Sequence, residues 1–247
     1  MPIIQLILSI VILSILYIRM IKREVPSIKK SQAIVPVIFG IVSLIISVII
    51  SLGGGYILTK LGWNRNNIDN LILRSICSAF FFAGFPEEIG KLLFILISIS
   101  IFKPKNVYEY LLIGFGVGAG FTMFEEFLYE SSLLTTILRT LIISFHAILS
   151  SIMATYIGKA KYYKVSNIEN KNITLQYVKA LLIPIIIHTV YDATNVKNAG
   201  LEKGVSDNIQ EIAVIIALIV MLIAFVWQIV YLIRVKKDTE ALIKMQM

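Results

Sequence analysis

The sequence predicts an all-α fold, a polytopic membrane bundle of seven to eight transmembrane helices, on three observations. Apolar residues make up 57% of the chain and charged residues only 15%, unlike an ordinary soluble domain. Several apolar segments approach or exceed the roughly 20 residues that a helix needs to cross a bilayer. The basic residues gather in short blocks beside these segments.

Seven apolar segments account for the predicted spans: residues 3–18, 34–58, 75–102, 110–128, 139–157, 175–193 and 209–233. The first is short for a span, and the third is long. Pro86 lies inside the third, and proline fits the first turn of a helix, where its missing N–H needs no partner. We therefore expect a broken or interfacial piece up to Ala83, followed by a helix that Pro86 opens. A further half-span between Leu71 and Phe85 would bring the count to eight.

The first segment is expected to be a retained helix and not a signal peptide. Residues 1–17 contain no Lys or Arg, and the segment has no small-residue cleavage site. Neither an internal repeat nor a soluble domain is evident. We therefore interpret residues 1–247 as a single integral membrane domain.

The basic residues that give the chain its net charge of +8 are unevenly distributed between the two sides of the predicted membrane domain. With seven spans, fourteen Lys and Arg residues fall on one side of the membrane and six on the other. The positive-inside rule then places the N-terminus outside the cell membrane and the C-terminus in the cytoplasm. Because the basic blocks flank the spans, they indicate contact with anionic lipids and argue against nucleic-acid binding.

Ionisable residues inside the apolar segments are the main functional signal. Glu87, Glu88 and Lys91 lie within five residues of one another in the third segment, where a charge at the bilayer centre costs at least about 2.5–3.5 kcal/mol. Similar residues occur in three later segments: Glu125, Glu126, His146, His188 and Asp192. Both histidines of the chain belong to this set. The pattern indicates polar chemistry inside the membrane.

The predicted topology brings these groups to one depth. The fourth span runs outward and carries Glu125 in its outer quarter, while the fifth begins near Arg139 and carries His146 seven residues later. The sixth runs outward and carries His188 and Asp192 toward its end. We therefore predict that Glu87, Glu88, Glu125, His146, His188 and Asp192 line one cavity in the outer half of the membrane.

Spacing along the helices refines this prediction. Residues four apart share a helix face, so Glu87 should pair with Lys91, and His188 with Asp192. Pro184, four residues before His188, should kink its helix and free a carbonyl. Alternating glycines in the fourth span should allow a close helix approach that holds Glu125 near a neighbour: Gly114, Gly116, Gly118 and Gly120.

Four motifs in this order resemble those of the PrsW family of intramembrane proteases. They are Glu87-Glu88-x-x-Lys91, Phe121-x-x-x-Glu125, the isolated His146, and His188-x-x-x-Asp192. That family is related to the CAAX prenyl endopeptidases and to the CPBP proteins of bacteriocin-immunity type. The resemblance covers residues 83–193 approximately. One departure is Glu126, which stands where many relatives have Asn and adds a negative charge.

The resemblance implies hydrolysis of a peptide bond in a membrane-anchored substrate near the extracytoplasmic side. A single-span anti-sigma factor is the substrate that it suggests. Glu87, as the first glutamate of its pair, is expected to activate water as general base in preference to Glu88. His146 and His188 would orient the water, bind a metal or stabilise the oxyanion. Asp192 would fix the tautomer of His188, and Glu125 would serve as a ligand or a second acid.

The sequence leaves the metal question open. Glu125, His146 and His188 form an acceptable zinc set with a fourth position for water. However, the histidines lie on different helices, without the His-Glu-x-x-His spacing of many zinc proteases.

Two other classes of function remain. Buried carboxylates and histidines also suit a proton- or ion-coupled transporter, although the chain shows no pair of inverted repeats. A non-catalytic immunity or scaffold protein of the same fold is the third hypothesis. In the simplest structural interpretation, Glu87, Glu88 and Lys91 form an ion-paired lock between helices, and Glu126 faces water at the end of its helix.

Overall fold

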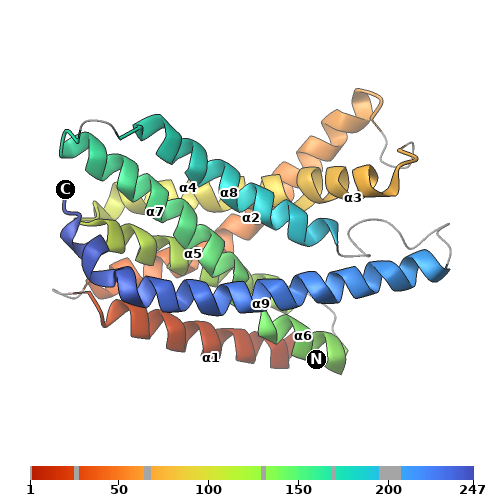
Figure 1. Ribbon diagram of the computed structural model, residues 1–247, viewed down its shortest axis with the longest axis horizontal. Helices are drawn as coiled ribbons and strands as arrows, with labels where there is room; N and C mark the ends of the chain where they lie inside the picture. The colour runs from red at the N-terminus through yellow and green to blue at the C-terminus, as the bar shows by residue number, and fades with distance from the viewer. Residues whose placement is uncertain (1, 25–27, 64–67, 129–131, 169–170, 195–206) are drawn as a thin grey trace.

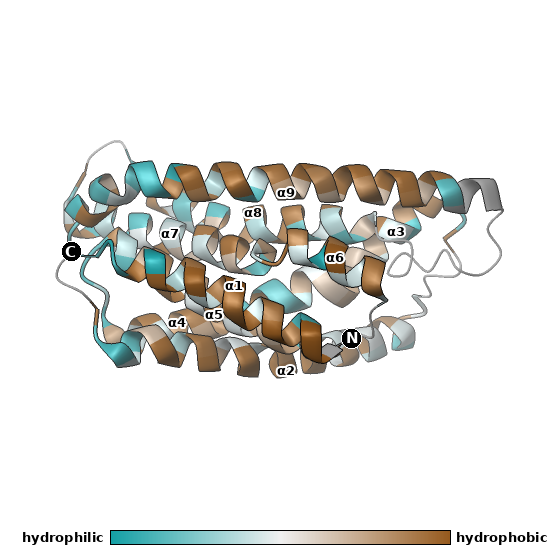
Figure 2. Ribbon diagram, turned by 90° about the horizontal axis from the view of Figure 1, so that it is seen from below, coloured by the Kyte–Doolittle hydropathy of each residue, from teal (hydrophilic) through white to brown (hydrophobic). Residues whose placement is uncertain are grey.

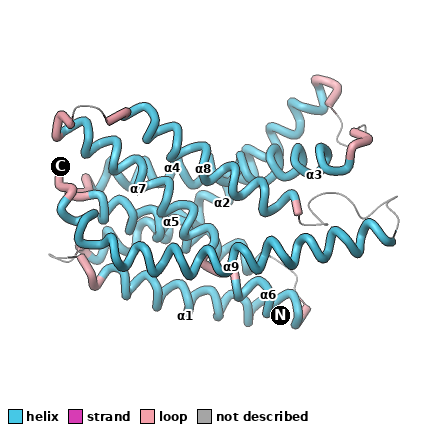
Figure 3. The backbone as a smooth tube through the Cα atoms, viewed as in Figure 1, coloured by secondary structure: helices cyan, strands magenta, loops and turns pink. Residues whose placement is uncertain are grey.

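The computed structural model describes residues 2–24, 28–63, 68–128, 132–168, 171–194 and 207–247. These residues contain no β-strand, only one isolated bridge between Asn106 and Gln246 (Figure 3). The helical elements in chain order are α1 (Pro2–Ile21), α2 (Lys30–Lys60), α3 (Leu71–Ala79), the π-helical segment η2 (Phe80–Gly84), α4 (Phe85–Phe102), α5 (Val107–Leu128), α6 (Leu133–Leu141), α7 (Phe145–Val165), α8 (Ile173–Ala193) and α9 (Asp207–Lys244) (Figure 1).

The prediction of an all-α polytopic membrane bundle is confirmed. Among the described residues, six helices are long and apolar enough to cross a membrane, with α6 and α7 counted together as one. The continuous helix formed by α3, η2 and α4 occupies the place of the predicted third span and carries its three charged residues. Hydrophobic residues cover the long outer helices, including α9, and hydrophilic residues gather at the end near the C-terminus (Figure 2).

The helices run alternately along one axis. The connections α1–α2, α4–α5 and α7–α8 lie at the end that holds the C-terminus (Figure 1, left). The start of α1 and the ends of α2, α5 and α8 lie toward the other end, as do the starts of α3, α6 and α9. The start of α4, the end of α5, the start of α7 and the end of α8 therefore share that second end, and these are the stretches that carry the predicted site residues.

Helix α5 is the central helix, and its alternating glycines face two sides. A Cβ atom at Gly114 or Gly118 would overlap the backbone of α7, at Ser150 and at His146 and Ala147 respectively. A Cβ atom at Gly120 would overlap the backbone of α2. Since residues four apart share a face, the alternation lets α5 approach both neighbours closely. The predicted role of these glycines is confirmed.

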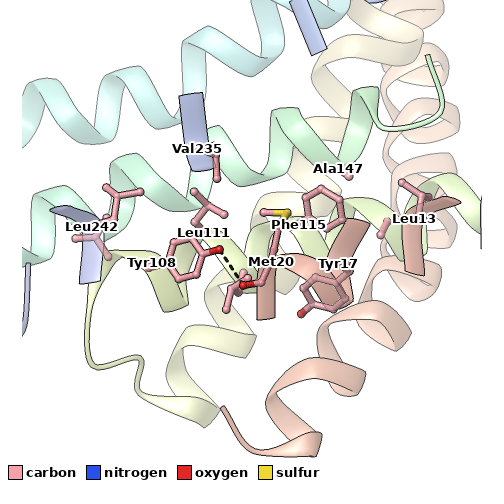
Figure 4. Close-up of a cluster of buried hydrophobic side chains, with 12 residues drawn as sticks. Leu13, Tyr17, Met20, Tyr108, Leu111, Phe115, Ala147, Val235 and Leu242 are labelled. Atoms are coloured by element: carbon pink, nitrogen blue, oxygen red, sulfur yellow. Dashed lines mark hydrogen bonds between the residues drawn. The ribbon is translucent and has the colours of Figure 1, made fainter. Parts of the chain in front are cut away.

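A buried cluster fastens the outer helices to α5 at the end away from the site. Tyr108, Leu111 and Phe115 of α5 pack against Tyr17 of α1 and Val235 of α9 (Figure 4). The Tyr108 hydroxyl also donates a hydrogen bond of 2.9 Å to the carbonyl of Met20, the residue before the last of α1. This end of the bundle is therefore held by both apolar packing and a polar contact.

The stretch around Pro86 differs from the prediction of a broken helix. The chain stays helical from residue 71 to 102, and the disturbance is absorbed by η2 immediately before Pro86. A proline ring clashes with the carbonyl four residues earlier and offers it no N–H. That carbonyl belongs to Phe82, and it accepts a hydrogen bond of 3.1 Å from the Ser51 hydroxyl of α2. The wider π turn and Ser51 together make the proline compatible with a continuous helix.

The fifth predicted span is interrupted. Residues 142–144 form a turn between α6 and α7, so that His146 lies in the first turn of α7 and not in the middle of a helix. The Ser144 hydroxyl in this turn hydrogen-bonds to Gln228 of α9 at 2.6 Å. At the same end of the bundle, the Ser75 hydroxyl of α3 donates to the carbonyl of Ala193, the last residue of α8.

The glycine contacts predict the effect of one added methyl group. Gly118→Ala should lower the free energy of unfolding by about 1–3 kcal/mol, because the new Cβ overlaps the α7 backbone at His146. Thermal unfolding of the purified protein in detergent measures the change. The matched control is Gly54→Ala in α2, where no described atom lies within 4 Å of the added Cβ. It should be neutral or stabilising by up to about 1 kcal/mol, and equal destabilisation by both would contradict the packing.

Candidate active site

A cavity of about 180 Å³ lies where α4, α5, α7 and α8 meet. Five of the six predicted site residues line it: Glu87, Glu125, His146, His188 and Asp192. Glu88 lies behind this lining, fully buried, and hydrogen-bonds to His188. Glu126, Arg139, Phe145 and Tyr191 contribute further walls. The structure thus brings all six predicted residues together.

Lys91 connects two parts of the site. Its ammonium group donates a hydrogen bond of 2.6 Å to Glu88 Oε1 and lies 3.1 Å from His146 Nδ1. The expected pairing of Lys91 with Glu87 is wrong, because Glu88 and Lys91 both face the packed interior while Glu87 turns toward the cavity. The side chains of Glu88 and Lys91 are 0% exposed, against 22% for Glu87.

His188 is held on both sides of its ring. Its Nδ1 lies 2.8 Å from Glu88 Oε1, while its Nε2 lies 3.2 Å from Asp192 Oδ2 and 3.6 Å from Glu87 Oε2. The predicted contact between His188 and Asp192 is therefore present. Glu88 supplies the carboxylate at Nδ1, and Asp192 approaches the nitrogen that faces the cavity.

His146 reaches the same cavity from α7. Its Nε2 lies 2.9 Å from Glu125 Oε2, and the centre of its ring lies 4.9 Å from that of His188. Phe121, one turn before Glu125, packs against the His146 ring and also lies 4.3 Å below the Lys91 ammonium. The Phe121-x-x-x-Glu125 motif therefore positions both the aromatic ring and the carboxylate against His146.

Arg139 also lines the cavity, although the sequence indicated only that it begins the fifth predicted span. Its guanidinium binds both oxygens of Glu126, with the shortest contact at 2.7 Å, and lies 3.5 Å from Glu125. Glu126 is 4% exposed, so the expectation that it faces water is wrong. Two adjacent glutamates at a helix end need a cation, and that need was the available signal for Arg139.

Three side chains are arranged so that they could hold a metal ion. One ligand atom each from Glu87, His146 and His188 lies within 4.8 Å of the other two. Glu87 Oε2 is buried and has no hydrogen-bond partner among the described residues, as expected of a group with another partner in the functional state. The predicted zinc set contained Glu125 with the two histidines, whereas this group contains Glu87 in its place. A carboxylate behind His188 Nδ1 is also typical of a metal-binding histidine.

Comparison with known proteins gives the family. The model of the PrsW family intramembrane metalloproteases matches residues 30–228. Protease PrsW of Halalkalibacterium halodurans is 31% identical over 126 residues, which cover 48% of this chain and 54% of the relative. Protease PrsW of Oceanobacillus iheyensis is 29% identical over 130 residues, covering 51% of this chain and 56% of the relative. These alignments thus span about half the length of either relative.

No solved structure matches the chain. The family match nevertheless covers most of the sequence and includes all four motifs that meet at the cavity. The chain belongs to the PrsW family of intramembrane metalloproteases.

Proposed function

We propose that this protein is an intramembrane endopeptidase that hydrolyses a peptide bond of a membrane-anchored substrate. The observation that carries the proposal is the cavity between four membrane helices, lined by four carboxylates and two histidines. Hydrolysis inside a bilayer needs an enclosed polar space, a base for water and groups that stabilise the developing oxyanion. These residues supply all three.

Glu87 is the base in this proposal. Its Oε2 is buried, faces the cavity and has no hydrogen-bond partner within the described part of the chain, so it can accept a proton from a water molecule. Glu88 is less suited because its Oε1 already accepts from Lys91 and contacts His188. Glu88 connects α4 to α8 through its contact with His188, while Glu87 acts as the base. The proton taken by Glu87 then passes to the amine of the leaving strand.

The histidines act beside Glu87. Glu88 and Asp192 fix the ring of His188, while Glu125 and Lys91 fix that of His146. Both rings therefore enter the reaction in set orientations, and they would bind the attacking water or the carbonyl oxygen of the substrate.

The donor set also fits a zinc ion, in keeping with the family's description as metalloproteases. His146 and His188 would hold the ion together with one carboxylate, either Glu87 or the predicted Glu125. Zinc would polarise the attacking water and the scissile carbonyl. A carboxylate that binds the ion cannot also take up the proton of the water. With Glu125 as ligand Glu87 remains the base, and with Glu87 as ligand Glu125 takes that role.

Charge distribution supports cleavage near the extracytoplasmic side. The connections α1–α2, α4–α5 and α7–α8, the helix ends that flank them and the last part of α9 together carry most of the basic residues, and they lie at the end of the bundle away from the cavity. The positive-inside rule assigns that end to the cytoplasm, with the N-terminus outside and the C-terminus inside. The substrate we propose is a single-span membrane protein, such as an anti-sigma factor, cut in the outer part of its span.

The proposed roles of Glu87 and Glu88 predict that one substitution mainly reduces cleavage and the other mainly reduces stability. Glu87→Gln should abolish cleavage of a single-span reporter, by about 10²–10⁴-fold, because an amide cannot accept the proton. Glu88→Gln should retain weak activity but lower stability by up to about 3–5 kcal/mol, because Lys91 stays buried without its carboxylate. Cleavage rates and thermal unfolding are measured on both variants. Cleavage by Glu87→Gln but not by Glu88→Gln would reverse the assignment.

The zinc content of purified variants shows whether Glu87 is the general base or a metal ligand. The purified protein should hold about one zinc ion per chain, and His188→Ala or His146→Ala should remove it. Elemental analysis after gel filtration gives this result without an activity assay. Glu87→Gln should keep the ion if Glu87 is the base, and loss of zinc from this variant would make Glu87 a ligand. Absence of zinc from wild-type protein that cleaves would exclude the zinc mechanism.

The Arg139 contacts predict a compensating pair. Arg139→Gln should reduce activity because Glu125 and Glu126 lose their shared cation and repel each other beside His146. Adding Glu126→Asn removes the excess charge and should recover part of the activity. Cleavage kinetics of the wild type, both single variants and the double variant form the cycle. Additive losses would show that Arg139 does not act through Glu126.

A further inference from the structure

A second space of about 310 Å³ adjoins the cavity and opens on the outer surface of the bundle. We refer to it as the α2 groove, because Ser47, Val48, Ser51 and Leu52 of α2 form one wall. Phe82, Glu87 and Glu125 line both the α2 groove and the active-site cavity. The two spaces therefore adjoin at the carboxylates to which the proposed function gives chemical roles.

The α2 groove faces the membrane. Val48 is 48% exposed and Leu52 is 71% exposed on a helix that is apolar enough to span the bilayer. Only lipid or another transmembrane segment can meet such a surface at this depth. The groove lining also contains two carboxylates and two serines, and apolar acyl chains offer such polar groups no hydrogen-bond partner. The lining thus favours a protein segment as the occupant.

The size of the groove indicates how the segment binds. A helix about 10 Å wide occupies about 120 Å³ per residue, so the groove holds roughly two to three residues. The groove therefore accommodates the residues around a scissile bond, while the rest of the segment would lie outside it. A peptide bond within a helix is also shielded, because its carbonyl and N–H groups are hydrogen-bonded along the chain.

Ser51 can provide a hydrogen-bond partner for an unwound substrate segment. Its hydroxyl donates to the carbonyl of Phe82, so its oxygen keeps lone pairs that can accept a substrate N–H, whereas Ser47 is 2% exposed and lies against Gly90 of α4. Such partners are needed because an unpaired backbone group in the membrane is costly. Phe82 stands where the groove joins the cavity, and the absence of a Cβ on Gly55 lets its ring lie against α2.

We propose that the membrane-anchored substrate enters laterally and lays an unwound stretch of its span in the α2 groove, beside Glu87 and Glu125. This inference rests on the proposed function and names the route by which its substrate reaches the site. A second groove, between α8 and α9, also reaches Phe145 and Tyr191 of the cavity wall, but none of its lining residues is a carboxylate. The α2 groove is therefore the substrate path.

Photo-crosslinking tests the docking independently of cleavage. A benzophenone side chain is placed at Leu52 in the full-length Glu87→Gln variant, and the probe is a tagged single-span reporter with a Leu- and Ala-rich span that carries Gly and Ser in its outer quarter. The control position is Leu222 of α9, 62% exposed and outside both grooves. Leu52 should capture the reporter several-fold more than Leu222. Equal capture, or capture of lipid alone at Leu52, would overturn the proposal.

A bulky side chain placed in the α2 groove tests whether substrate must occupy the groove for cleavage. Val48→Trp should lower kcat/KM for the same reporter by about tenfold, mainly through KM, because the indole occupies the substrate's place. Ile45→Trp is the matched control: Ile45 lies on the same helix, is also 48% exposed and does not line the groove. Equal effects of the two variants, at equal thermal stability, would overturn the docking. Capture at Leu52 with no cleavage by the wild type would instead refute the protease function and leave the docking site standing.

Discussion

The Lys91 ammonium and the Glu88 carboxylate meet at 2.6 Å without any exposed surface, and the rest of the site is arranged around them. Burying either charge alone would cost several kcal/mol, so the pair persists only while both members stay in contact. Each also reaches a histidine, Lys91 on α7 and Glu88 on α8. One turn of α4 thereby determines how two other helices present their rings. Glu88 and Lys91 thus form the ion pair expected of a structural lock, while Glu87 faces the cavity, where the proposed function gives it a catalytic role.

The frame that allows this contact is made of small residues. Gly114 and Gly118 bring the backbone of α7 against α5, and Gly120 brings α2 against its other face. Larger residues would move the start of α7, and with it His146, away from Glu125. The glycines therefore act on the chemistry through distance: contacts of about 3 Å between groups on different helices need backbones that touch.

Much of this arrangement could be predicted from the sequence, because its causes are local. The length of apolar segments determines the spans, and the placement of Glu125, His146 and His188 along them determines a common depth. The partner of Lys91 could not be predicted, because residues three and four positions before it are both within reach on a helix and neighbouring helices decide between them. Arg139 was missed for a similar reason: its two glutamate partners lie on another helix, 13 and 14 residues earlier. The choice between Glu87 and Glu125 beside the histidines likewise depends on how the helices rotate against each other.

The π-helical turn before Pro86 has a consequence for how sequences of this family should be compared. A π turn accommodates one residue more than an α turn, so α3 and α4 follow one path but differ in angular register by about 100°. A relative that lacks one residue between positions 80 and 84 could keep both glutamates in place only by turning α3 about its axis. A single-residue gap in this stretch would therefore change which side chains α3 presents on its outer surface, while Glu87 and Glu88 would keep their places.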